Sequence, residues 1–302
     1  AAAGYITRYA AVPGHRAVIY TNNTSAYAHL ATLAGAGIVI ERIVDLRTKI
    51  NEAERELARA HAVPILTGAQ ILDVRGRRSV SSVLIGTDSG TTNVACDLVC
   101  HSGGWSPLVH LHSHAGGKPV FDQGIAAFVP GEPVQQESCI GGARGFFSLA
   151  ATLMDASSTA QQVVRSLTGQ SAALRPADVV ADEIGYGIEV VWPQKDVTSK
   201  AFVDFQNDVT TSDIALAVRE NFQSIEHVKR YTTAGMAVDQ GRISNTNVIG
   251  LVSRELGQEQ GATGTTTFRP PFAPVSFGVV GGSERGQLII PARTTPITQW
   301  NI

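Results

Sequence analysis

The residues with the clearest potential for chemistry lie in the small-residue segment Ser138 to Ala143, which reads Ser-Cys-Ile-Gly-Gly-Ala. A short apolar run that stops at Pro130 and Gly131 precedes it, and a helical pattern through Leu153 follows it. Glycine lets a backbone approach a ligand closely, and the start of a helix offers free N–H groups to a phosphate. The pattern predicts half of a dinucleotide site, with a turn that only packs as the alternative.

Three histidines at alternate positions, His110, His112 and His114, form the second candidate. On a strand their rings would share one face and could bind zinc or copper. The neighbouring proline and glycines favour a loop instead, so we expect structural or surface histidines and no metal. We find no Ser-His-Asp order, paired carboxylates or phosphate-binding loop elsewhere, and we assign no catalytic residue.

Composition limits the classes of function. The 302 residues carry 24 Lys and Arg against 26 Asp and Glu, and 43% are hydrophobic. This balance gives no overall field for nucleic acid or an anionic membrane. No apolar run is long enough to span a bilayer, and the three cysteines (Cys96, Cys100 and Cys139) fit buried thiols in a reducing cytoplasm. We therefore expect a cytoplasmic protein that binds neither nucleic acid nor membrane.

A β-α-β unit is predicted from Arg16 to Asp45, with a helix over 26–34 and an acid at the tip of its second strand. The acid has the spacing to meet a ribose. The turn at 21–26 lacks the glycines that let a backbone close over a pyrophosphate, so we expect a structural lobe without a nucleotide.

Further elements follow from periodicity. We expect an N-terminal helix, an outer charged helix over 51–60, strands near 63–66, 69–74 and 79–85, and a strand from Cys96. The helix after residue 146 is expected to fade at 155–158 and resume over 159–167, followed by a linker over 171–182. Helices are predicted over 211–220 and 224–233, the first capped by Thr210, and extended chain from Gly250.

Several long strings give the sequence a family resemblance. GHRAVIYTNNTSAY, CDLVCHSGGWSPLVHLHSHAGGKPVFD, KAFVDFQNDVT, SIEHVKRYTTAGMAVDQGRISN and TGTTTFRPPFAPVSFG together resemble the alpha subunit of heterotetrameric sarcosine oxidase. Members of that family are several times longer. The chain resembles the central part of such a subunit.

The resemblance implies an α/β fold with two dinucleotide-binding, Rossmann-like domains, incomplete at the N-terminus and followed by a small helical lobe. Residues 1–14 and 96–170 would form the returning half of a split domain, and 15–95 the domain inserted into it. Residues 190–260 would form the helical lobe, and 261–302 the start of an aminomethyltransferase-like folate domain.

The resemblance also implies a partial NAD site, with FAD and FMN mainly on a partner subunit. Related folds place a Gly-Asp pair and a helix start against the cofactor. The matching positions here are Gly131, Glu132, Gly142, Ala143, Phe147, Ser148 and Leu149.

The helical lobe resembles domains that hold a [2Fe-2S] cluster through cysteines. The corresponding positions are Asp204, Gln206, Asp239 and Ser244. Oxygen ligands do not replace thiolates around iron–sulfur, so we expect a lobe without a cluster.

The function implied is that of a cofactor-binding and assembly portion of a complex that oxidatively demethylates sarcosine with dioxygen. Its products would be glycine, formaldehyde or methylene-tetrahydrofolate, and hydrogen peroxide. Expected partners are a beta-like flavoprotein subunit, small subunits, and tetrahydrofolate through a domain absent here. The alternatives are an FAD- or NAD-dependent oxidoreductase of the same superfamily acting on an opine or other secondary amine, and an inactive fragment.

Overall fold

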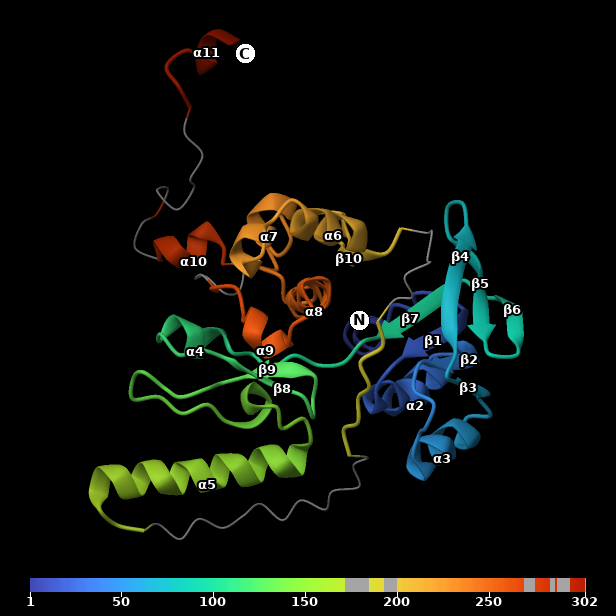
Figure 1. Ribbon diagram of the computed structural model, residues 1–302, viewed down its shortest axis with the longest axis horizontal. Helices are drawn as coiled ribbons and strands as arrows, with labels where there is room; N and C mark the ends of the chain where they lie inside the picture. The colour runs from blue at the N-terminus through green and yellow to red at the C-terminus, as the bar shows by residue number, and fades with distance from the viewer. Residues whose placement is uncertain (172–184, 193–199, 269–274, 283–285, 287–293, 302) are drawn as a thin grey trace.

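A parallel sheet of four strands organises the first hundred residues of the computed structural model, which describes residues 1–171, 185–192, 200–268, 275–282, 286 and 294–301 (Figure 1). The strand order is β3 (Ile65–Thr67), β2 (Val39–Asp45), β1 (Arg16–Thr21) and β7 (Leu98–Ser102). All three pairings are parallel. The predicted α/β, Rossmann-like class is confirmed.

The sheet is buried on both faces because alternate residues of β1 point to opposite sides. Ala17 and Ile19 pack with the residues of α1 (Ala2–Tyr9), α2 (Leu30–Gly35) and α3 (Glu52–Ala60). Val18 packs on the other side with an antiparallel sheet, β4 (Gln70–Gly76), β5 (Val80–Thr87) and β6 (Gly90–Ala95). Three layers result, and we call residues 2–102 the sheet lobe.

Three details of this lobe differ from expectation. The helix after β1 starts as a 3-10 helix, η1 (Thr24–His29), before α2, because the Asn23 side chain accepts from the Ser25 amide and tightens the first turn. β7 pairs with β1, so the parallel sheet continues past the boundary expected between residues 95 and 96. The N-terminal helix was also placed with 96–170, yet its Ala2 and Ile6 pack on the sheet lobe.

The segment after β7 contains little sheet. It has the short helix α4 (His110–His114), a hairpin of β8 (Val120–Asp122) and β9 (Ala127–Val129), the 3-10 turn η2 (Gly141–Arg144) and the helix α5 (Leu149–Thr168). α5 is continuous, so the break expected at 155–158 is wrong. None of its 20 residues is buried, and Figure 1 shows it along one side of the molecule.

The helical lobe packs around a helix that the sequence did not reveal. α6 (Thr211–Arg219) and α7 (Ile225–Thr232) were predicted, and Thr210 caps α6 through a capping box with Asp213, as predicted. α8 (Asn245–Leu256) replaces the extended chain expected from Gly250, because Ile249 and its neighbours form the core of the lobe. The remaining elements are β10 (Phe202–Asp204), β11 (Val209–Thr210), α9 (Gln260–Thr263), α10 (Phe277–Gly281) and α11 (Thr298–Asn301).

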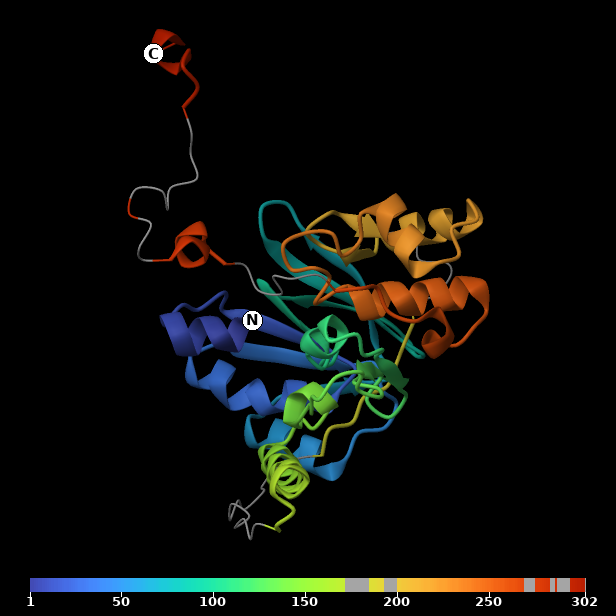
Figure 2. The same cartoon turned by 90° about the vertical axis from the view of Figure 1, so that its left-hand side faces the viewer.

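Figure 2 shows the helical lobe beside the sheet lobe, with the C-terminal helices extending away from both. The linker predicted over 171–182 lies outside the described residues, except for Ser171. None of the helices in the described ranges combines the length and the apolar character needed to cross a bilayer.

Candidate functional site

Side chains of α5 fix the turn between β9 and α5 through hydrogen bonds. The Asp155 carboxylate accepts hydrogen bonds from the Gly141 amide at 2.8 Å and from the Arg144 guanidinium at 2.6 Å. Thr152 donates to the Phe146 carbonyl at 3.0 Å. Gly141 has φ +58°, and a Cβ there would lie 2.6 Å from the Thr152 methyl group. The inner side of the turn is therefore closely packed.

The outer side of the same turn is open. Gly142 is exposed, and a Cβ built on it would meet no atom within 4 Å. The neighbouring Ala143 is half-buried. A ligand could reach the backbone at Gly142 without displacing a side chain. We call residues 141–149 the open turn.

The predicted residues at the start of α5 lie in this turn. The Ser148 hydroxyl caps the helix by accepting from the Ala151 amide at 3.1 Å. Phe147 packs edge-on against Tyr186 with ring centroids 4.8 Å apart. Leu149 is 55% exposed. The structure thus brings together Gly142, Ala143, Phe147, Ser148 and Leu149 around one helix start, where the helix dipole favours an anion.

Gly131 makes close contacts within the chain. Its amide donates to Nε2 of the buried His112 at 3.2 Å, and a Cβ on it would overlap the Lys118 carbonyl. Because Nε2 accepts, Nδ1 carries the proton and donates to Glu137 at 2.6 Å. The Gly131 amide is therefore engaged within the chain, whereas the next residue, Glu132, is exposed.

The histidine string forms a helix, neither the loop that was favoured nor a strand. His110 and His112 are buried, and His110 packs on Phe268 with ring centroids 4.0 Å apart. Burial, followed by the charges of Arg242 and His114, lowers the pKa of His110 to about 4. Within the described ranges no three His, Cys, Asp or Glu side chains are placed to hold a metal ion.

The acid at the tip of β2 is enclosed in a buried ionic network. Asp45 accepts from Tyr27 at 2.8 Å and from Arg47 at 2.8 and 3.0 Å, and Arg47 also pairs with Glu54 at 2.8 Å. Asp45 and Glu54 are both 0% exposed. Burial, and then the charge of Asp45, raises the pKa of Tyr27. A ribose could not reach this carboxylate.

Glu54 corrects the expectation that the charged helix only forms an outer face. Its carboxylate accepts from the Asn51 amide at 2.7 Å while the Asn51 side chain accepts from the Glu54 amide, and the same carboxylate pairs with Arg47. The Asn-x-x-Glu spacing of this capping box was visible in the sequence. The burial of its acid was not.

Three of the four positions matched to cluster ligands, Asp204, Gln206 and Ser244, are joined by hydrogen bonds. Asp204 is buried and accepts from the amides of Gln206 and Gly235 at 2.9 and 2.7 Å and from the Ser244 hydroxyl at 3.4 Å. Asp239 instead accepts from the Gly241 amide at 3.1 Å. The Asp204 carboxylate thus ties together segments of the lobe around the matched positions.

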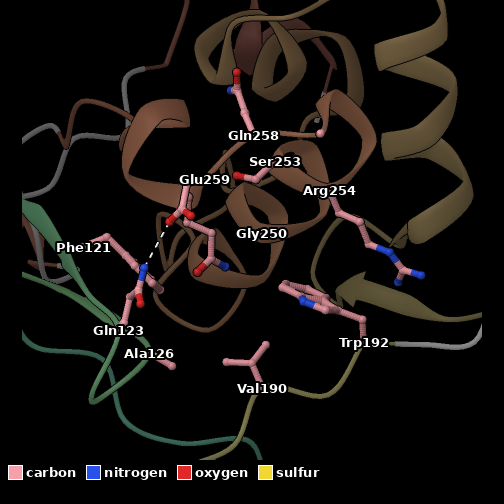
Figure 3. A pocket seen from close by; sticks show the side chains of 12 residues that line it. Phe121, Gln123, Ala126, Val190, Trp192, Gly250, Ser253, Arg254, Gln258 and Glu259 are labelled. Carbon is pink, nitrogen blue, oxygen red and sulfur yellow. Dashed lines mark hydrogen bonds between the residues drawn. The ribbon is translucent and has the colours of Figure 1, made fainter.

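A cavity of about 620 Å³ lies away from the open turn. It is bounded by the β8–β9 hairpin, the chain at 190–192, and helices α8 and α9 (Figure 3). Gln123 bridges to Glu259 at 3.1 Å, and Trp192 lies so close to Gly250 that no side chain would fit there. The cavity contains none of the predicted cofactor-binding residues, and no motif in the sequence pointed to it.

Comparisons with known proteins agree with the resemblance seen in the sequence. Residues 198–284 match the model of the sarcosine oxidase A3 domain. The chain is 37% identical to sarcosine oxidase subunit alpha of Rhizobium meliloti over 98% of its length, and 35% identical to the same subunit of Corynebacterium sp. strain P-1 over 99%. These matches cover 30% and 32% of the two relatives.

A solved structure supports the fold. The L-proline dehydrogenase of P. horikoshii is similar over 91% of this chain and 51% of that chain, with a TM-score of 0.62 and 14% identity. Such a low identity bears on the fold alone. The chain spans about a third of the length of the curated relatives it matches, so it corresponds to only one part of them. Over nearly all its length, the chain is related to one part of the sarcosine oxidase alpha subunits.

Proposed function

We propose that the chain is part of an oxidoreductase subunit of the sarcosine oxidase alpha type and supplies one side of a dinucleotide site there. The observation that carries the proposal is the open turn. Its inner side is fixed by α5, whereas a Cβ built on Gly142, on the outer side, would meet no atom within 4 Å. The turn therefore combines a fixed inner side with an outer side that a ligand could reach.

NAD is the proposed cofactor. The backbone at Gly142 and Ala143, together with the first turn of α5, would face the pyrophosphate, because both offer close approach and a partial positive charge. The exposed carboxylate of Glu132 would accept hydrogen bonds from a ribose, and the Phe147 ring would line the site. When bound, the nicotinamide would supply hydride transfer.

The residues of this chain would bind and orient the cofactor, and we assign none of them to the substrate chemistry. The complex as a whole would demethylate sarcosine with dioxygen, giving glycine, formaldehyde or methylene-tetrahydrofolate, and hydrogen peroxide. A beta-like flavoprotein subunit with small subunits would carry most of the FAD and FMN. The complex would work in the cytoplasm.

The proposal is tested with the variant Gly142→Leu, made in the full-length polypeptide and purified with its subunits. A Cβ at residue 142 meets no atom within 4 Å, so we expect the variant to fold, while its side chain would occupy the path of the pyrophosphate. We expect NAD affinity to fall by about 10-fold or more, or roughly 1.4 kcal/mol. Gly35→Leu is the matched control, because a Cβ built on Gly35 would also meet no atom within 4 Å.

Retained NAD would be measured in native mass spectra and by titration. Equal NAD affinity in the two variants and the unmodified protein would show that the open turn does not bind the cofactor.

A further inference from the structure

The segment Gly185 to Trp192 crosses the sheet lobe at the turn after β1, and we call it the crossing segment. The Thr24 amide donates to the Gly187 carbonyl at 2.9 Å, and the Gly187 amide donates to the Thr24 hydroxyl at 3.1 Å. The Glu189 amide donates to the Asn22 carbonyl at 3.0 Å, and the Asn22 side chain donates to the Glu189 carbonyl at 2.8 Å. An extended peptide is thus paired with the turn.

This turn is where an open α/β sheet ordinarily takes its ligand. β1 has β2 on one side and β7 on the other, so the chain reverses its direction across the sheet at β1. Ligands bind at such a point, outside the carboxyl ends of the strands. Here the Asn23 side chain spans the gap between the strands by donating to the Ser102 carbonyl at 2.8 Å, and Thr21 donates to the same carbonyl at 3.2 Å.

The shapes of the two surfaces fit closely. Gly104, which follows β7, has φ +104°, and a Cβ on it would lie 2.6 Å from Ile188 and 2.9 Å from the Tyr186 hydroxyl. The Tyr186 hydroxyl accepts from the Trp105 amide at 3.1 Å. A side chain at residue 104 would push the crossing segment away, so glycine there is explained by the contact.

We propose that this crevice of the sheet lobe is an internal peptide-binding site, whose occupant is residues 186–189 of the same chain, and that it takes no dinucleotide. Backbone pairing supplies the binding, as when a peptide adds to the edge of a sheet. Tyr186 extends the contact to Phe147 in the open turn, so the bound segment links the two regions. The inference stands whether or not the open turn binds NAD.

Amide hydrogen exchange on this chain tests the proposal. The amides of Gly187 and Glu189 should be protected in the unmodified protein. Thr24→Val keeps the shape of the side chain and the backbone bond from the Thr24 amide, but removes the two hydrogen bonds between the hydroxyl and Gly187. It should speed exchange at these two amides about 10-fold. Thr87→Val, which removes a hydroxyl from the exposed β5–β6 turn, should leave them unchanged.

A second variant and a ligand complete the test. Asn22→Ala removes one bond to Glu189 from a half-buried position and should give the same acceleration if Thr24→Val fails to fold. Millimolar NAD should not slow exchange at residues 22–27. Unprotected Gly187 and Glu189 amides in the unmodified protein, no acceleration in a folded variant, or protection of residues 22–27 by NAD would each overturn the proposal.

Discussion

Two turns in this chain connect a strand to a helix, and they differ in whether the chain itself covers the surface that a ligand would contact. After β1, the side chains of Asn23 and Thr24 and the crossing segment satisfy the polar groups of the turn. Before α5, Gly142 leaves the outer side empty. A Rossmann-like position is therefore a candidate site only where the chain does not fill it.

The difference follows from residue type. Asparagine and threonine carry donors and acceptors that bond to nearby backbone, so their side chains satisfy the polar backbone groups of a turn that contains them. Glycine has nothing to contribute and exposes its peptide groups. The acids at the two strand ends differ in the same way. Asp45, at the tip of β2, is buried and paired with Arg47, whereas Glu132, which precedes the open turn in the chain, is exposed.

The largest loss of stability is expected when the buried ionic network around Arg47 is broken. Arg47→Met keeps the bulk of the side chain but leaves the buried Asp45 and Glu54 without their cation. Removing one member of a buried ionic group costs about 3–5 kcal/mol. Urea denaturation should show a loss of that size in the free energy of unfolding.

Arg59→Met is the matched control, since Arg59 pairs with Glu52 at 2.7 Å with both side chains more than half exposed. An exposed pair contributes about 0–1 kcal/mol. Similar losses in the two variants would contradict the view that the network closes the tip of β2.

A second closed position lies in the helical lobe, and its disruption should have an intermediate effect. Asp204→Asn retains the size of the side chain but places an N–H group where the carboxylate accepts from Gly235 and Ser244. A buried donor left without an acceptor costs about 1–3 kcal/mol, so we expect a loss of about 2 kcal/mol in urea denaturation.

Asp208→Asn is the comparison for this change. Asp208 is exposed with φ +53°, a conformation that asparagine accepts readily. Its stability should stay within about 0.5 kcal/mol of the unmodified protein. If Asp204→Asn were equally neutral, the carboxylate would not be the tie between the segments it joins.

The parts of the fold that could be predicted are those that depend on sequence patterns over a few neighbouring residues. The β-α-β unit from Arg16 to Asp45 and the Thr210 capping box depend on neighbours within a few residues, and both are present. α8 was missed because its glycine, serine and asparagine content hides a helix whose formation depends on burial in the lobe. Tertiary packing overrides propensity in such cases.

In the candidate site, too, local groupings could be predicted and long-range contacts could not. The grouping of Gly142 to Leu149 followed from a strand, a turn and a helix in sequence, and the structure brings these residues together. The crossing segment pairs with Asn23 from 165 residues away in the sequence, and His112 engages Gly131 through a ring whose direction depends on α4. Neither contact has a sequence signal, because each is fixed only when distant elements pack.

The smallest effect should come from two neighbouring glycines of the open turn, and it should differ between them. Gly141→Ala places a Cβ 2.6 Å from the Thr152 methyl group at φ +58°, so about 1–2 kcal/mol of stability should be lost. Gly142→Ala meets no atom within 4 Å, so the free energy of unfolding should change by less than about 0.5 kcal/mol. Thermal or urea unfolding of the two alanine variants measures the difference directly. Equal losses would mean that the outer side of the turn is as closely packed as the inner side, and the contrast with the turn after β1 would disappear.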